Sequence, residues 1–320
     1  MNAPLHVDVV EPLVVPTSLA ELAEEYCTHS VRVRGVHESR RDAERPYLKR
    51  FFDWFGPPES PADLFSRINA DSVTQCLIEY ASKYGPGSRR CMQGTVRLFL
   101  RFAYHMGYVG RDLSALSPTV REPRMGRVVR PIPPECIETL QNSIVGDTPA
   151  DFRDRAIVCL LSTYGVRGVQ IRRLRLEDVD WSRERIHFAP VKRGRAVKQP
   201  LTASTGNRLA EYLRKGRPSS SHREVFLHAD EPFGPLARPN QLSKILRKRI
   251  EQAGITLPEG VPCGSHGFRH AFATRMYGRV PFKDVMDMLG HRDPCSTLIY
   301  GKVDLVSLRK AALPWPGGAR

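Results

Sequence analysis

Residues 265–278 read SHGFRHAFATRMYG, and the interpretation of this stretch decides that of the whole chain. His266 and His270 are four residues apart, so a helix would place them on one face, as in helical zinc sites. No glutamate lies between them to act as a general base, and Arg269 would bring a fixed positive charge beside a metal ion. His266 and Arg269 together suit a phosphate or another oxyanion. Taken alone, the stretch favours a simpler interpretation, in which His266 caps a helix and Arg269 pairs with a carboxylate.

Four residues elsewhere in the chain change that balance. They are Arg167 in YGVRGVQIRRL, Lys192 at or beside the turn of a predicted hairpin, His291 in DMLGH, and Tyr300 in STLIYGK. No cluster of carboxylates accompanies them that would hold magnesium. Cations that stabilise a phosphorane, a proton donor for the leaving oxygen and an attacking side chain suit phosphodiester chemistry without a metal. We therefore expect neither a metal nor a cofactor.

The order R…K…H-x-x-R…L-G-H…Y resembles the tyrosine recombinases, also called the phage integrase family. H-x-x-R and L-G-H are weak signals by themselves, but the ordered set extends over about 135 residues. The resemblance covers roughly residues 18–310. It implies a mainly α fold with a small β-sheet (α+β), in which a helical core-binding domain precedes a mixed catalytic domain.

The resemblance also implies roles for the residues that match the family pattern. Tyr300 would be the nucleophile that leaves a 3′-phosphotyrosyl bond and a free 5′-hydroxyl. Arg167 and Arg269 would clamp the non-bridging phosphate oxygens, for which a planar and permanently charged fork is suited. His291 would donate a hydrogen bond to the phosphate.

The remaining proton-transfer roles fall on the hairpin and on the opening stretch. Lys192 would protonate the departing 5′-oxygen, and it aligns with the family's hairpin lysine better than Arg193 or Lys198 does. His266 would be the acid-base partner of the tyrosine. His270 would support the site from the adjoining turn, or would be only structural.

One position departs from the family pattern. Three residues after the first arginine the family usually carries an acidic residue, whereas this chain has Gln170. Glutamine can form hydrogen bonds but brings no charge, so Arg167 would be held less firmly. Glu177 or Asp178 are candidates for a substitute carboxylate.

The charge of the chain points to a polyanionic partner. Lys and Arg exceed Asp and Glu by 15 among 320 residues, and the pI is about 9.8. Such a balance favours nucleic acid, because neutralising phosphates releases counterions, although many basic proteins bind nothing in particular. No apolar run reaches the length of a membrane span, and the N-terminus does not resemble a signal peptide. The seven cysteines are scattered singly, which suggests reduced thiols in the cytoplasm.

Helical and strand periodicities divide the chain into four segments. We expect residues 1–17 to be an extended segment, 18–116 a helical bundle, 117–134 a proline- and arginine-rich linker, and 135–320 a mixed domain with a C-terminal tail. The resemblance implies that the bundle is a DNA core-binding domain and the mixed domain the catalytic one. Residues 185–201 alternate around a glycine and predict a β-hairpin. The tail after Tyr300 would pack on a neighbouring subunit, as in the family, or fold back on its own domain.

Two helices carry basic residues that are candidates for DNA contact. The helix predicted over 88–110 places Arg97 and Arg101 away from its apolar face, with Gly110 as its terminator. The helix predicted over 240–254 places Lys244, Arg247 and Lys248 outside. A basic helix face either lies against DNA or is simply solvated.

The sequence thus predicts a site-specific DNA recombinase or integrase of the cytoplasm and nucleoid. Its partner would be double-stranded DNA, and two strand exchanges would require a tetramer on two DNA sites. The short region before Ser18 leaves no room for an arm-binding domain, which favours a simple recombinase, most readily a mobile-element integrase or transposase. A metal-independent nuclease and a non-catalytic DNA-binding protein are the alternatives.

Overall fold

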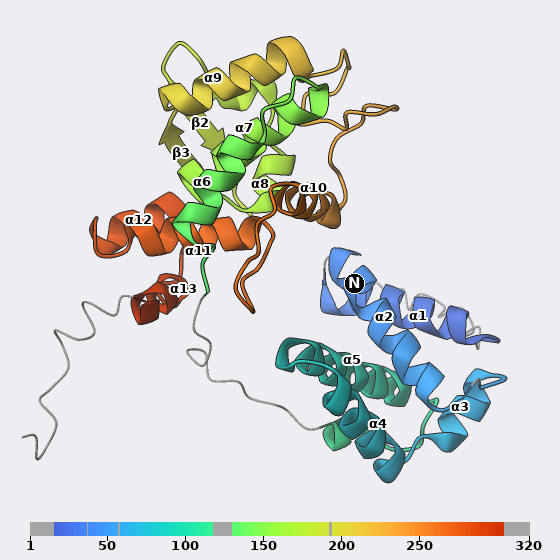
Figure 1. Ribbon diagram of the computed structural model, residues 1–320. Coiled ribbons are helices and arrows are strands. Elements are labelled where there is room, and N and C mark those ends of the chain that lie inside the picture. Colours follow the sequence, from blue (N-terminus) through green and yellow to red (C-terminus); the bar gives the residue numbers. More distant parts are fainter. Residues whose placement is uncertain (1–15, 37, 57, 118–129, 192–193, 304–320) are drawn as a thin grey trace, which may run out of the picture. The chain divides into compact units, whose positions relative to one another are not determined.

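The computed structural model describes two compact units, Met1–Glu122 and Pro123–Arg320 (Figure 1). Within them, the residues described are 16–36, 38–56, 58–117, 130–191 and 194–303. Each unit has its own hydrophobic core and is described by itself. Among the described residues, no helix combines the length and the apolar character that crossing a membrane would require.

The first unit is entirely helical in its described part. Its helices are α1 (Leu19–Arg34), α2 (Glu38–Trp54), α3 (Pro61–Arg67), α4 (Ala70–Lys83), α5 (Pro86–His105) and a 3-10 turn at Ser114–Leu116. Three starts are fixed by side-chain caps, because Ser18, Ser60 and Asn69 accept hydrogen bonds from backbone N–H groups that the first helical turn leaves unpaired.

The core of this unit is built on α5, whose buried face was predicted correctly. Val96, Phe99, Leu100 and Ala103 are all fully buried. The Phe99 ring packs edge-on against aromatic rings of α1 and α2. The predicted terminator Gly110 is wrong: α5 ends at His105, and the left-handed residue that follows is Gly107, with a φ of 76°.

The second unit combines helices with a small sheet. Its helices are α6 (Pro134–Ser143), α7 (Pro149–Tyr164), α8 (Gly168–Arg172), α9 (Ala203–Glu211), α10 (Pro239–Gln252), α11 (Ser265–Met276), α12 (Phe282–Leu289) and α13 (Cys295–Leu298). Shorter turns lie at Leu176–Asp178, at Tyr212–Gly216 and at Ile299–Val303.

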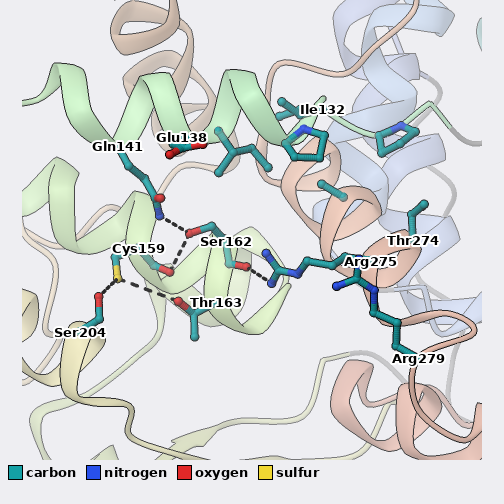
Figure 2. A pocket seen from close by; sticks show the side chains of 14 residues that line it. Ile132, Glu138, Gln141, Cys159, Ser162, Thr163, Ser204, Thr274, Arg275 and Arg279 are labelled. Carbon is teal, nitrogen blue, oxygen red and sulfur yellow. Dashed lines mark hydrogen bonds between the residues drawn. The ribbon is translucent and has the colours of Figure 1, made fainter.

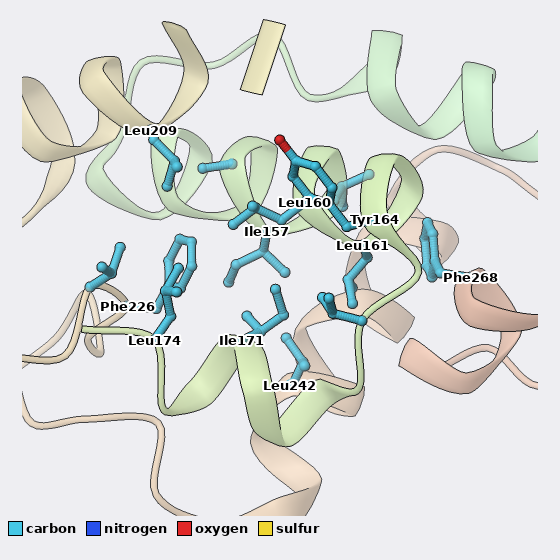
Figure 3. Packing of buried hydrophobic residues seen from close by; sticks show 14 of the residues in the cluster. Ile157, Leu160, Leu161, Tyr164, Ile171, Leu174, Leu209, Phe226, Leu242 and Phe268 are labelled. Carbon is cyan, nitrogen blue, oxygen red and sulfur yellow. The ribbon is translucent and has the colours of Figure 1, made fainter. Parts of the chain in front are cut away.

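Helix α7 is the centre of this unit. It is apolar around most of its circumference, and it contacts α6, α8, α9, α10 and α11. Figure 3 shows Ile157, Leu160 and Leu161 of α7 among side chains from these neighbours. Thr148 caps its start, and Gly165, in the left-handed conformation, ends it as the sequence predicts. The end of α7 is therefore fixed where the site residues begin.

The sheet has three antiparallel strands in the order β1-β2-β3. They are β1 (Val179–Asp180), β2 (Arg185–Phe188) and β3 (Val197–Pro200), with Ile186 opposite Gln199. The predicted hairpin over 185–201 is thus present. Strand β1 was not predicted from the sequence.

Three helices were also missed. Helices α3, α6 and α13 are short and begin at or just after proline, a residue that the first helical turn accepts. Helix α2 begins nine residues before the predicted apolar cluster at 47–56 and contains Pro46 in its interior.

Candidate active site

Helix α11 carries the stretch SHGFRHAFATRM, whose side chains are divided between the core and the surface. Phe268 and Phe272 are buried in hydrophobic clusters, which fixes the rotation of the helix. That rotation leaves His266 exposed and buries Arg269, whose exposed fraction is only 4%. A buried guanidinium must find hydrogen-bond acceptors, and its contacts define the centre of the site.

Arg269 connects the ends of α7 and α12. Its Nη1 donates to the carbonyl oxygen of Gly165 at 2.9 Å, and its Nη2 donates to that of Leu289 at 2.7 Å. Burial and the nearby charge of Arg167 lower the pKa of Arg269 to about 10, so the group stays charged at neutral pH. Its predicted partner was a phosphate or a carboxylate; in the described structure its acceptors include two backbone carbonyls, a histidine and the hydroxyl of Tyr300.

That histidine is His291, which follows α12. Arg269 Nη2 lies 2.7 Å from His291 Nε2, and a guanidinium nitrogen can only donate, so Nε2 accepts. The proton of the neutral ring is therefore on Nδ1, which donates to Thr297 Oγ1 at 2.7 Å. Burial, followed by the charges of Arg269 and Arg167, lowers the pKa of His291 to about 3. Both ring nitrogens are occupied and Nε2 carries no proton, so the predicted donation to a phosphate from Nε2 requires both the release of Arg269 and a proton on that nitrogen.

Tyr300 is buried beside His270. The hydroxyl oxygen of Tyr300 is 3.2 Å from His270 Nδ1, and the tyrosine is only 2% exposed. Burial raises the pKa of Tyr300, while the charges of Arg269 and Arg167 act against that rise. Burial and the neighbouring His266 and Arg269 lower the pKa of His270 to about 4, so its ring is neutral near pH 7.

The two histidines of α11 thus take different places from those predicted. The acid-base contact with the tyrosine was assigned to His266, but the hydrogen bond to the Tyr300 hydroxyl is formed by His270. The ring of His266 lies 6.3 Å from that of His270, between their centroids, on the exposed side. Four-residue spacing puts both on one face, and only the packing of Phe268 and Phe272 determines which one points inward.

Arg167 stands at the start of α8 and approaches the same centre. It is half-buried, and burial lowers its pKa, while Tyr300 acts against that shift. Its backbone N–H donates to Gln170 Oε1 at 3.0 Å. A Cβ built on Gly194, in the connection between β2 and β3, would lie 3.7 Å from Arg167 Nη1. The hairpin connection therefore passes directly beside the arginine.

The hairpin connection itself is anchored to α12. The backbone N–H of Gly194 donates to Val191, and that of Arg195 donates to the carbonyl of Gly290 at 3.4 Å. Lys192, the predicted proton donor, and Arg193 lie outside the described residues. Lys198, the alternative, is exposed on β3 opposite His187.

The predicted substitutes for the family's acidic residue do not act as such. Glu177 pairs with the exposed Arg175 and Arg223, and Asp178 accepts from the backbone N–H of Arg175. Both belong to the turn at Leu176–Asp178, so neither replaces the missing carboxylate. Among the described residues, no group of three or more His, Cys, Asp and Glu side chains is arranged to hold a metal ion.

The basic candidates differ in how free they are to bind. Lys244, Arg247 and Lys248 are exposed on α10, as predicted. In the other unit Arg101 is exposed, whereas Arg97 is half-buried and donates from Nε and Nη2 to the carbonyl of Ser117. Arg97 therefore has a structural contact, and Arg101 is the better candidate of that pair.

A pocket of about 820 Å³ borders the other side of α11, between α6 and α7 (Figure 2). Its walls are joined through Ser162, whose hydroxyl accepts from Gln141 at 2.7 Å and whose carbonyl accepts from Arg275 at 2.9 Å. Among the described residues, none of those predicted to be catalytic lines it. The pocket's contacts hold α11 against α7 and so help to position Arg269.

Sequence reasoning missed the residues that hold the catalytic candidates. Thr297, which fixes the tautomer of His291, and the carbonyls of Gly165 and Leu289, which receive Arg269, carry no sequence signal of their own. Their contacts form only because the fold brings together the ends of α7 and α12 and the short helix α13.

Comparison with known proteins identifies the family. Residues 133–305 match the phage integrase family. A putative integrase/recombinase, y4rA, of Sinorhizobium fredii is 32% identical over 95% of this chain and 73% of its own length. The tyrosine recombinase XerD of Corynebacterium glutamicum is 26% identical over 92% of this chain and 97% of its own.

Solved structures show the same fold. The XerH site-specific recombinase bound to its difH substrate superposes with a TM-score of 0.69 at 18% identity, covering 91% of this chain and 83% of that one. A lambda integrase tetramer bound to a Holliday junction gives a TM-score of 0.66 at 14% identity, with 90% and 78% covered. The predicted mainly α fold with a small sheet is confirmed. From the family match and the 32% identical relative, the chain belongs to the phage integrase family, the tyrosine recombinases.

Proposed function

We propose that this chain, a tyrosine-type site-specific recombinase, breaks and rejoins DNA with the hydroxyl of Tyr300, without metal or ATP. The observation that carries the proposal is the grouping of the Tyr300 hydroxyl with a neutral His270 and with two guanidinium groups. Two fixed cations beside a nucleophile favour attack on a phosphodiester, because they stabilise the charge that builds up on the phosphorane.

The chemical step is a transesterification, in which one phosphoester bond replaces another. The Tyr300 oxygen attacks the phosphorus, the bond from phosphorus to the 5′-oxygen breaks, and a 3′-phosphotyrosyl bond replaces it. Arg167 and Arg269 would hold the non-bridging oxygens, and Lys192 would give its proton to the departing 5′-oxygen. Because the phosphotyrosyl bond retains the energy of the broken one, a 5′-hydroxyl of the partner strand can reverse the step.

The tyrosine must also lose its proton. His270 is within hydrogen-bond reach of the Tyr300 hydroxyl, and its lowered pKa keeps it in the neutral form that can accept. His266, on the exposed side of the same helix, is then the histidine that would meet the DNA. We assign the proton to His270 and a phosphate contact to His266.

Cleavage requires a change in the segment that carries Tyr300. With 2% exposure the hydroxyl cannot meet a DNA phosphate, and Arg269 and His291 are bonded to each other. A phosphate oxygen that replaced the His291 contact would free Nε2 of His291, which could donate to the phosphate once that nitrogen carries a proton. We therefore assign the described arrangement to the protein before it engages DNA.

The partners follow from the charge and from the relatives. The chain's formal charge of +15 favours double-stranded DNA. Solved relatives of the same fold are bound to DNA, one of them as a tetramer on a Holliday junction. We infer a tetramer on two DNA sites, acting at the nucleoid in the cytoplasm. The y4rA relative is named a putative integrase/recombinase, and for this chain we propose an integrase of a mobile element.

The domain roles are part of the same proposal. Residues 18–116 would contact DNA as the core-binding domain, 117–134 would cross the backbone as a linker, and 135–320 would carry the chemistry. Residues 118–129 and the tail at 304–320 lie outside the described residues.

A nicked suicide substrate tests the proposal. The substrate would be taken from any inverted repeats that sequencing finds beside the gene. It would carry a nick near the cut, so that the short fragment with the free 5′-hydroxyl diffuses away and the covalent protein-DNA adduct accumulates. We expect an adduct that resists denaturant and is lost in Tyr300→Phe but kept in Tyr277→Phe, a nearby half-buried tyrosine. Cleavage that survives Tyr300→Phe would identify a nuclease. Binding without cleavage at every flanking repeat would identify a DNA-binding protein.

A further inference from the structure

Thr297 is a buried hydrogen-bond partner of His291. Its exposed fraction is 0%, and its Oγ1 lies 2.7 Å from His291 Nδ1. It belongs to α13, the short helix that precedes Tyr300. The other ring nitrogen, Nε2, accepts from Arg269 Nη2 at 2.7 Å. The imidazole therefore lies between a guanidinium, which can only donate, and a hydroxyl.

The hydroxyl of Thr297 can serve either state of the nitrogen that it faces. A hydroxyl has one hydrogen and two lone pairs, so Oγ1 can accept from a protonated Nδ1 or donate to a bare one. A backbone carbonyl in the same place could only accept, and it would keep the proton on Nδ1. Because Arg269 occupies Nε2, the described structure has the first arrangement. The hydroxyl leaves the second arrangement open.

A bound phosphate would reverse the demand on Nε2. In the proposed function a phosphate oxygen replaces the contact between Arg269 and His291, and such an oxygen accepts, so Nε2 must carry a proton. A second proton on the ring is costly, because burial and the charges of Arg269 and Arg167 lower the pKa of His291 to about 3. A neutral ring can meet the phosphate only if its proton is on Nε2 instead of Nδ1.

We propose that Thr297 is a positioning residue that allows His291 to exchange tautomers. Its hydroxyl accepts from Nδ1 before DNA binds, and it donates to Nδ1 when Nε2 donates to the phosphate. Nδ1 gives its proton to water and Nε2 takes one from water, so the ring stays neutral and no other reactant is needed. This inference rests on the proposed function, which assigns the phosphate contact to His291.

The hydrogen bond from Thr297 should matter most during cleavage. As charge builds up on the phosphorane, Nε2 donates to it more strongly, and Nδ1 becomes a better acceptor. The Thr297 hydroxyl then stabilises the transition state more than the bound substrate, and its loss should slow the chemical step.

Nitrogen NMR shows the tautomer directly, because protonated and bare ring nitrogens differ in chemical shift. With isotopically labelled histidine, the His291 signals are those that are missing from His291→Asn. In the DNA-free protein we expect the proton on Nδ1. In Tyr300→Phe bound to the nicked substrate, which it cannot cleave, we expect the proton on Nε2. A proton that stays on Nδ1 in the complex, or a ring that is protonated on both nitrogens, would overturn the inference.

Two variants separate the hydroxyl of Thr297 from its shape. Thr297→Val keeps the shape and loses the hydroxyl, and we expect its single-turnover cleavage to fall by about 10- to 100-fold, as for the loss of a buried hydrogen-bond partner. Thr297→Ser keeps the hydroxyl and should cleave within about threefold of wild type. Thr205→Val removes a hydroxyl that is equally buried on α9, away from the site residues, and as the matched control it should cleave like wild type.

The outcomes distinguish this inference from the proposed function. Thr297→Val that cleaves like wild type, or Thr297→Ser that is as slow as Thr297→Val, would contradict a role for the hydroxyl. Thermal unfolding shows whether each variant keeps its fold; if Thr297→Val does not, the tautomers of His291 and the rate of Thr297→Ser decide. An adduct that forms while His291 keeps its proton on Nδ1 refutes this inference alone. If wild type binds the substrate and forms no adduct, the proposed function fails, and this inference fails with it.

Discussion

At the scale of single residues, His291 shows how one hydrogen-bond partner sets the state of another group. Arg269 cannot accept, so His291 must accept through Nε2 and must carry its proton on Nδ1, where Thr297 receives it. A second proton on the ring would face the Arg269 guanidinium. The fold therefore binds the neutral imidazole, and the cost of protonation appears as a loss of stability.

This coupling predicts a dependence of stability on pH. The pKa of His291 falls from its usual 6.5 to about 3 on folding, so below pH 6.5 the unfolded chain binds a proton that the folded chain does not. The contribution of His291 is complete above pH 6.5 and is lost as the pH falls. Between pH 6.5 and 5 we expect it to cost about 2 kcal/mol of unfolding free energy.

The variant His291→Asn separates this effect from other titrations. Asparagine cannot titrate, and its amide nitrogen can take the place of Nδ1 as the donor to Thr297, so urea unfolding of the variant should lose about 2 kcal/mol less over the same pH range. His270, whose pKa is also lowered, contributes equally to both proteins. Identical pH slopes for the two proteins would contradict the neutral state of His291.

The identities of the catalytic candidates could be predicted from the sequence, whereas their partners could not. Arg167, Arg269, His291 and Tyr300 were picked out by their order, and the second unit brings them together. The choice between His266 and His270 could not be made, because it depends on the rotation that buried phenylalanines impose on α11. That rotation is a property of the packed core.

At the scale of elements, a single glycine joins the hairpin to the end of α12. Gly290 ends α12 with a φ of 63°, and a Cβ there would lie 2.8 Å from Val197 Cγ2 and 3.0 Å from the Arg195 carbonyl oxygen. Gly254, at the end of α10, has nearly the same φ of 65° but no atom within 4 Å of such a Cβ. The two glycines differ only in what surrounds them.

The two glycines predict different effects of alanine. At Gly254 the substitution strains only the backbone, whereas at Gly290 it also displaces the hairpin connection. Gly254→Ala should cost about 1 kcal/mol of unfolding free energy for the left-handed backbone and leave DNA cleavage unchanged. Gly290→Ala should cost a further 1 to 3 kcal/mol, roughly, and slow cleavage by about tenfold or more, because the connection beside Arg167 must move. Chemical denaturation and single-turnover cleavage measure the two effects; equal cleavage by both variants would refute the role of Gly290.

Elements with long periodic patterns could be predicted, and short ones could not. The apolar face of α5 and the hairpin over 185–201 follow directly from side-chain spacing. Strand β1 has two residues, too few for any alternation to show, and exists because β2 offers it an edge. Because α7 is apolar around most of its circumference, its sequence does not indicate which helices it contacts.

At the scale of the whole molecule, the positive charge is divided between binding and folding. Arg249 on α10 bonds Asp151 at 2.7 Å and Asp154 at 2.8 Å, joining α10 to α7. Its sequence neighbour Lys248 is exposed. The sequence grouped the two as mostly outward-facing cations, and only the structure separates them.

This separation predicts opposite consequences for adjacent substitutions. Lys248→Gln should leave stability unchanged, weaken DNA binding and reduce the slope of log affinity against log salt by about one. Arg249→Gln should cost about 3 kcal/mol of unfolding free energy, because the carboxylates of Asp151 and Asp154 lose the cation that joins them, and should leave the salt slope unchanged. Binding titrations over a salt series and urea unfolding test both, and a reversed pattern would contradict the assignment.

The proposed recombinase activity depends on one covalent bond, between DNA and the oxygen of Tyr300. Trypsin would release that residue in the peptide Asp293–Lys302, DPCSTLIYGK, in which it is the single tyrosine. Fragmentation mass spectrometry of this peptide, from an adduct digested with nuclease, locates the attached nucleotide. We predict a nucleotide joined through its 3′-phosphate to Tyr300. A nucleotide on Ser296, on Thr297 or on another peptide, or cleaved DNA with no attached peptide, would contradict the account.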